Sequence, residues 1–173
     1  EFQSIIANVG IEFRLANLDP SGNCTNGIER IYSSQTYEGN DWSKLDPWPR
    51  DKYLNVWAVD KMGGGAAGYA YYPGSVQSVN EVPMIDGVII LNDYIGSTGT
   101  SNPYTSRALT HEIGHCLNLK HPWGDTNSPG IACGDDNVDD TPITKGWLSC
   151  PSAANSAVCN PPIKENYQNY MDY

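Results

Sequence analysis

The segment HEIGHCLNLKH, residues 111–121, contains all three histidines of the chain. His111 and His115 are four positions apart, so a helix places both imidazoles on one face, one turn apart, where they can bind the same metal ion. Glu112 is rotated by about 100° from His111, which is a poor position for a ligand and a good one for contacting a metal-bound water. A histidine pair at this spacing also arises by chance, and the third histidine decides between the two interpretations.

His121 constrains the backbone more strongly than the pair does. If the helix continued, His121 would lie ~15 Å along its axis from His111, and metal–nitrogen bonds of about 2.0–2.1 Å could not form. Asn118 lies where the helix must stop, and Asn is second only to Gly in tolerating the positive φ that ends helices. Pro122 then biases His121 toward an extended conformation. We therefore predict a positive φ at Asn118 and a zinc site of the HExxH kind.

The surrounding sequence predicts a helix and several strands. The helix is expected over 107–117, capped by Thr105 or Ser106. One of its faces is apolar and packs on a core, and His111 and His115 lie on the opposite face. The apolar face consists of Leu109, Ile113, Cys116 and Leu117. Short apolar runs bounded by turn residues indicate strands at 11–18, 28–32, 53–59, 68–72 and 86–92.

The composition limits the classes of protein that fit. A chain of 173 residues is long enough for one domain with a core, and no apolar run is long enough to cross a bilayer. The formal net charge of −10 argues against a nucleic-acid partner. The start, EFQSIIANVG, lacks the features of a signal peptide, so the chain is either cytosolic or already processed. Three of the five cysteines follow residue 132 in a loop-rich region, which favours disulfides and export.

The zinc-site segment resembles a known motif. HEIGHCLNLKH resembles the HExxHxxGxxH motif of the metzincin metalloproteases, with Asn118 at the Gly position, where Asn is also found in the pappalysin family of metzincins. The segments HPWGD, CGDDNVDDTP and NYMDY, which begin at residues 121, 133 and 169, are similar to the same family. The resemblance covers nearly the whole chain, including the predicted strands upstream.

The resemblance implies an α+β fold with a twisted, mostly parallel five-stranded sheet, helices above the active-site helix, and a loop-rich lower subdomain. We expect a single catalytic domain over 1–173. Its upper subdomain, 1–121, ends in the zinc motif. Its lower subdomain, 122–173, ends in the family's Met-turn and is truncated there, because the helix that follows the Met-turn in metzincins is absent.

The resemblance also implies roles for single residues. Glu112 would be the general base that takes a proton from the zinc-activated water and returns it to the leaving amine. Tyr173 would stabilise the tetrahedral oxyanion, and Met171 would pack beneath the site in the Met-turn. Taken singly, these two could equally be a surface Tyr and an ordinary buried Met. The implied zinc ligands are His111, His115 and His121, which leave the fourth position open.

Calcium is a further implication of the family, whose members bind it in the loop corresponding to 133–142. Asp136, Asp139 and Thr141 are the candidate ligands, through carboxylate, carbonyl or hydroxyl oxygens. The alternative is a solvated acidic loop that binds no ion.

The family's disulfide pattern pairs Cys133 with Cys159. It pairs Cys150 with a cysteine shortly after the Met-turn, beyond residue 173. Cys116 is expected to be a buried thiol on the apolar face of the helix, and Cys24 has no assigned partner.

The function implied is that of a secreted zinc-dependent endopeptidase acting on proteins or peptides, without nucleic-acid partners or membrane insertion. The run 68–72 would then be an edge strand that pairs with extended substrate, or else an ordinary sheet edge. The alternative function is a zinc-containing binding or adhesion module with the protease fold but no turnover. The joint presence of Glu112, the three histidines and Tyr173 argues against it. A structural zinc is disfavoured because three histidines leave one coordination position unfilled.

Overall fold

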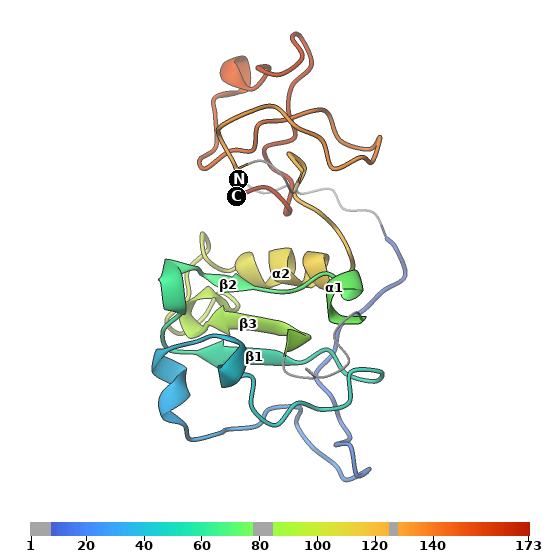
Figure 1. Ribbon diagram of the computed structural model, residues 1–173, viewed down its shortest axis with the longest axis vertical. Coiled ribbons are helices and arrows are strands. Elements are labelled where there is room, and N and C mark those ends of the chain that lie inside the picture. Colours follow the sequence, from blue (N-terminus) through green and yellow to red (C-terminus); the bar gives the residue numbers. More distant parts are fainter. Residues whose placement is uncertain (1–7, 78–84, 125–127) are drawn as a thin grey trace. The chain divides into compact units, whose positions relative to one another are not determined.

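The computed structural model describes residues 8–77, 85–124 and 128–173 (Figure 1). These residues form two compact units, Asn8–Leu117 and Asn118–Tyr173. No helix among the described residues is long and apolar enough to cross a membrane.

The first unit is built on a three-stranded sheet with the order β1-β3-β2. β1 (Val56–Val59) runs parallel to β3 (Val88–Leu91), with Val56 opposite Val88. β2 (Gly68–Tyr69) runs antiparallel to β3, with Gly68 opposite Ile90. The central strand has the continuous apolar sequence VIIL, and Val88, Ile89 and Ile90 are fully buried. Such a run is typical of a strand covered on both faces.

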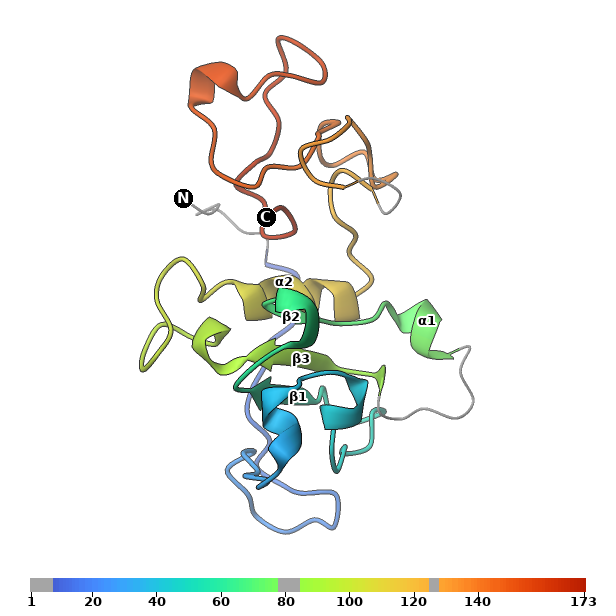
Figure 2. The same cartoon turned by 60° about the vertical axis from the view of Figure 1, so that its left-hand side comes forward.

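Two α-helices lie in the same unit. α1 (Pro73–Gln77) follows β2 after a short extended segment, and α2 (Ala108–Cys116) packs on β3 and β2 (Figures 1 and 2). The unit also contains short 3-10 turns. These are Ser34–Tyr37, Asp41–Ser43, Gly63–Gly65 and Asn92–Tyr94.

The expectation of a mostly parallel five-stranded sheet is wrong in strand number and direction for the described residues. The runs 11–18 and 28–32 form no strand, apart from a single antiparallel bridge between Leu18 and Cys24. Their apolar side chains are exposed, as at Leu15, which is 69% exposed. An alternating pattern specifies which side chains share a face, but a strand forms only where a partner edge accepts its backbone hydrogen bonds. The antiparallel addition of β2 makes the sheet mixed.

The helix expected over 107–117 is α2, but neither expected cap residue is used. Arg107 holds the N-cap position without a side-chain hydrogen bond. The hydroxyl of Thr105 donates instead to the carbonyl of Asp93 at 2.8 Å, and that of Ser106 donates to the carbonyl of Pro103 at 3.1 Å. Both hydroxyls therefore stabilise the preceding loop and not the helix.

The burial of α2 also differs from the expected pattern. Its buried residues are Glu112, Gly114 and His115, whereas Leu117 is 48% exposed. The other members of the expected apolar face, Leu109, Ile113 and Cys116, are half-buried. The buried side of α2 is therefore the side that carries Glu112 and His115. Tyr72, in the segment after β2, contacts His115 on this side.

The second unit, Asn118–Tyr173, has almost no regular structure, as the sequence predicted. Its described residues contain one 3-10 turn, Ala153–Asn155, and one antiparallel bridge between Gly134 and Thr144. Trp123 is its largest fully buried side chain, at 2% exposure. A Cβ atom on Gly146, whose φ is +72°, would lie 2.5 Å from Cε3 of Trp123. The indole therefore packs directly on backbone that only glycine can supply.

Candidate metal centre

His111 and His115 of α2 bring two imidazole rings of the candidate site together. The rings of His111 and His115 are 4.8 Å apart between centroids and nearly perpendicular, at 89°. The ring of Tyr72, from the segment after β2, meets His115 edge-on at 5.2 Å. The i, i+4 spacing on a helix accounts for the proximity of the two imidazoles.

The helix ends in the way the sequence predicted. The backbone N–H of Leu117 donates to the carbonyls of Ile113 and Gly114, both at 3.0 Å. Asn118 follows with φ of 68°, in the left-handed region, so the predicted positive φ is confirmed. One ligand nitrogen from each of His111, His115 and His121 lies within 4.8 Å of the others.

These three nitrogens fit a zinc ion by their chemistry. Three neutral imidazoles are the donor set of a zinc site that keeps one coordination position open. Among the described residues, they form the only group of three or more His, Cys, Asp or Glu side chains arranged to hold a metal ion.

Glu112 is 8% exposed, and this burial raises the pKa of its carboxyl to about 7. The backbone N–H of Ala70 donates a hydrogen bond to Glu112, which opposes the rise by favouring the charged form. A carboxyl with a pKa in this range can both accept and release a proton near neutral pH, which is what a general base has to do.

Two aromatic rings pack around His121 within the second unit. The indole of Trp123 stacks on the imidazole at 4.4 Å with an interplanar angle of 4°. The ring of Tyr173 lies 5.4 Å from His121 and 5.2 Å from Trp123. Trp123 was not predicted as a functional residue. The sequence His-Pro-Trp at 121–123 was a usable signal, because a ring two residues from a candidate ligand can fix the orientation of that ligand.

Hydrogen bonds between backbone N–H groups and side-chain oxygens hold the residues around Met171. Met171 is buried, and its N–H donates to Oδ1 of Asn169 at 2.9 Å. Asp172 is also buried, and its Oδ1 accepts the backbone N–H groups of Trp147 at 2.8 Å and Tyr173 at 2.9 Å. Burial raises the pKa of Asp172, and the hydrogen bonds from these two backbone N–H groups oppose the rise. The two bonds fix the position of the segment that carries Tyr173.

The acidic loop shows no comparable convergence. Asp136 Oδ1 accepts the backbone N–H of Val138 at 3.0 Å, while Asp139 is exposed and Thr141 is half-buried. Burial raises the pKa of Asp136, and the neighbouring carboxylates add to the rise. Calcium binding by Asp136, Asp139 and Thr141 stays a prediction.

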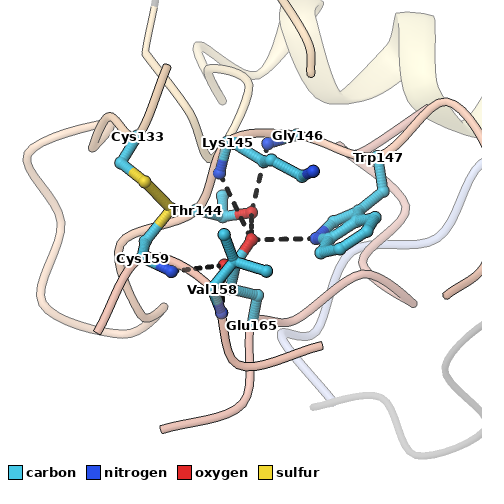
Figure 3. Close-up of a disulfide and its surroundings, with 8 residues drawn as sticks. All are labelled: Cys133, Thr144, Lys145, Gly146, Trp147, Val158, Cys159 and Glu165. Carbon is cyan, nitrogen blue, oxygen red and sulfur yellow. Dashed lines mark hydrogen bonds between the residues drawn. A yellow bond between two sulfur atoms is a disulfide. The ribbon is translucent and has the colours of Figure 1, made fainter. Parts of the chain in front are cut away.

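Glu165, which was not predicted as a functional residue, organises the centre of the second unit (Figure 3). The side chain is 3% exposed. Its Oε2 accepts the hydroxyl of Thr144 at 2.6 Å, the indole N–H of Trp147 at 2.8 Å and the backbone N–H of Lys145 at 3.3 Å. Its Oε1 accepts two further backbone N–H groups, Val158 at 3.1 Å and Cys159 at 2.9 Å. No local sequence pattern signals this residue.

The disulfide beside Glu165 is the one that the family resemblance implied. Cys133 is bonded to Cys159, with 5.6 Å between their Cα atoms (Figure 3). Cys116 is a half-buried thiol, and burial raises its pKa to about 11. Cys24 lies exposed in a loop.

Comparison with known proteins gives consistent matches. Residues 37–173 match a family model described as pregnancy-associated plasma protein-A. An extracellular metalloprotease of Arthroderma benhamiae is 32% identical over 152 residues, which cover 85% of this chain and 50% of the relative. An extracellular metalloprotease of Neurospora crassa is 35% identical over 123 residues, which cover 70% of this chain and 41% of the relative.

Among solved structures, mature mirolysin of Tannerella forsythia in complex with a cleaved peptide is similar, with a TM-score of 0.82 and 36% identity. The match covers 96% of this chain and 64% of the mirolysin chain. The chain thus spans about half the length of the curated relatives and less than two thirds of mirolysin.

Proposed function

Because this chain belongs to the pappalysin family of metzincin peptidases, we propose that it carries the catalytic centre of a zinc-dependent endopeptidase acting on proteins or peptides. The observation that carries the proposal is the convergence of three histidine nitrogens within 4.8 Å, with the buried carboxyl of Glu112 on the helix that carries two of them. The relatives named above are extracellular metalloproteases, and together with the disulfide this supports secretion.

His111, His115 and His121 would hold the zinc through one ring nitrogen each. When bound, zinc supplies Lewis-acid chemistry by polarising the scissile carbonyl and lowering the pKa of a water molecule. Glu112 does the proton transfer: its carboxylate takes a proton from the attacking water and returns it to the leaving amine.

The hydroxyl of Tyr173 would donate a hydrogen bond to the oxyanion that forms as the carbonyl is attacked. Its ring lies against His121 and Trp123, which supports a position close to a zinc ligand. Met171 would support this segment by packing. No observation favours the alternative of a zinc-containing binding module without turnover.

We extend the proposal to a calcium ion bound through oxygen atoms of Asp136, Asp139 and Thr141. Oxygen donors on a loop with four aspartates suit a hard cation. Calcium titration of the zinc-loaded protein, followed by a thermal shift that Asp136→Asn abolishes, tests it. An unchanged melting temperature at millimolar calcium would remove the ion from the proposal.

Cleavage of an unfolded protein substrate by the purified, zinc-loaded protein tests the main proposal, with Glu112→Gln as the matched variant. The substitution keeps the size of the side chain and removes the proton acceptor, so we expect kcat to fall about 10²–10⁴-fold at unchanged zinc content. A zinc-selective chelator should abolish cleavage, and added zinc should restore it. If the protein binds one zinc, cleaves nothing, and behaves like Glu112→Gln, the activity is disproved.

A further inference from the structure

An ion pair between the buried Lys44 and the half-buried Asp41 lies outside the candidate site, and it has no assigned catalytic role. Lys44 is 2% exposed, and its Nζ reaches Oδ1 of Asp41 at 3.2 Å. The same nitrogen donates to the carbonyls of Ile85 at 2.8 Å and Gly87 at 3.4 Å. An ammonium group has three N–H donors, so these three acceptors satisfy it completely. Burial lowers the pKa of Lys44, and the neighbouring Asp41 opposes that shift.

The carboxylate of Asp41 also accepts hydrogen bonds from two tyrosine hydroxyls. Tyr69, in β2, donates to Oδ1 at 2.9 Å, and Tyr71 donates to Oδ2 at 2.9 Å. Residues two apart in extended backbone point to the same side, which is how both hydroxyls reach one carboxylate. Lys44 Nζ lies 5.0 Å and 5.2 Å from the centres of the two rings, so the cation also faces their π systems.

The residue between the two tyrosines contacts the proposed general base. The backbone N–H of Ala70 donates to Glu112. The short segment 69–71 therefore joins the ion pair on one side to the carboxyl of α2 on the other. A shift of this segment moves a hydrogen-bond donor of Glu112, although neither Asp41 nor Lys44 touches Glu112 in any described contact.

The arrangement is not explained by stability. Removing two charges from water costs free energy that a buried ion pair recovers only in part, and apolar side chains of similar volume often stabilise as well or better. A fully satisfied polar network does, however, hold its members in one arrangement. The side-chain partners of Lys44 and Asp41 lie in three places: the residues just before β3, β2 itself, and the segment that follows β2.

We propose that the Asp41–Lys44 pair is a positioning device: through the hydroxyls of Tyr69 and Tyr71 it fixes the backbone of Ala70, which in turn orients Glu112 for proton transfer. The inference rests on the proposed peptidase function for its catalytic consequence, but not for its geometry. Asp41 and Lys44 are positioning residues, since neither contacts the proposed zinc ligands in the described structure.

The test uses the double variant Tyr69→Phe with Tyr71→Phe in the zinc-loaded protein. It removes two hydroxyls and keeps both rings. The matched control is Tyr53→Phe, which removes a hydroxyl that donates to the carbonyl of Leu18 at 3.1 Å in an exposed position of the same unit. The two readouts are the hydrogen-exchange rate of the Ala70 amide by NMR and the separate values of kcat and KM.

The double variant loses both hydrogen bonds to the Asp41 carboxylate, so the backbone between residues 69 and 71 is held less firmly. We therefore expect the exchange rate of the Ala70 amide to rise about tenfold and kcat to fall by a similar factor. Zinc content should not change, and Tyr53→Phe should match the wild type in both readouts. Glu112→Gln serves as a reference: it gives the exchange rate of the Ala70 amide when the group that accepts its hydrogen bond is weakened.

Unchanged exchange at Ala70 in a folded double variant overturns the proposal, whatever happens to kcat. Faster exchange with unchanged kcat in an active enzyme overturns its catalytic part. If the wild type shows no chelator-sensitive cleavage, the proposed function fails instead, and exchange at Ala70 still decides whether the ion pair holds this backbone. If the double variant does not fold, Tyr71→Phe alone leaves Oδ2 of Asp41 without its hydrogen bond and is read in the same way.

Discussion

Replacing Glu165 with Gln should destabilise the second unit severely, although the two side chains have the same shape. The carboxylate accepts at both oxygens, and all of its partners are donors. An amide group has only one acceptor oxygen. If its NH2 replaces Oε1, it faces the N–H groups of Val158 and Cys159. If it replaces Oε2, it faces the N–H groups of Lys145 and Trp147. Neither orientation satisfies the site.

The magnitude follows from the number of donors that lose their acceptor. Two part-buried N–H groups lose their acceptor in either orientation. A fully buried group would cost about 1–3 kcal/mol, so the total is at most about 2–6 kcal/mol. This is a large part of the 5–15 kcal/mol typical of a folded domain. Urea unfolding followed by tryptophan fluorescence measures it, since Trp147 itself donates to Glu165.

Glu29→Gln is the matched control. Glu29 also accepts an indole N–H, from Trp48 at 3.0 Å, but in an exposed position where water replaces the bond. Its substitution should change the free energy of unfolding by no more than about 0.5 kcal/mol. If Glu165→Gln unfolds at the same urea concentration as Glu29→Gln and the wild type, the hydrogen bonds assigned to Glu165 do not hold the unit together.

The stability difference between the wild type and Glu165→Gln should also become smaller as the pH falls. Burial by itself raises the pKa of Glu165, but the hydrogen bonds, led by that from Thr144, outweigh it, and the pKa is lowered from its ordinary value of 4.5. A lowered pKa in the folded state stabilises the protein above the unfolded pKa, and this stabilisation is lost as the pH falls through the folded value. The difference between wild type and Glu165→Gln should therefore be full at neutral pH and shrink below pH 4.5. A constant difference down to strong acid would refute the assignment.

Three further tests each address a single feature. Asn118→Gly should keep zinc affinity, whereas Asn118→Val should weaken it, because a β-branched residue is strained at φ of 68°. A competition titration with a chelating dye measures both affinities. Equal affinity in the two variants would show that the turn is not needed. Replacing Cys133 and Cys159 together by Ala should lower the free energy of unfolding by about 3 kcal/mol, measured in urea beside the reduced wild type, which should behave like the variant. Gly146→Ala places a Cβ 2.5 Å from a buried indole carbon at positive φ, so its melting temperature should fall by several degrees, a cost of about 1–3 kcal/mol; an unchanged value would mean that Trp123 can move.

The sequence determined those parts of the site that depend on neighbours in the chain. The pair at 111 and 115 follows from the 3.6-residue period of the helix, and the positive φ at Asn118 follows from the need to bring His121 back. Both act over a few residues, so spacing and residue type are enough to predict them. The disulfide between Cys133 and Cys159 came from the family resemblance, and the structure contains it.

Only the tertiary structure decided the features that join distant residues. The hydroxyl of Thr144 meets Glu165 across 21 positions, and those of Tyr69 and Tyr71 meet Asp41 across 28 and 30. It also decided that the alternating runs near the N-terminus form no strands, since pairing needs an available edge. A side chain's type limits the bonds it can make, but its burial and its partners exist only once the chain has folded, and these give Glu165 and the Asp41–Lys44 pair their importance.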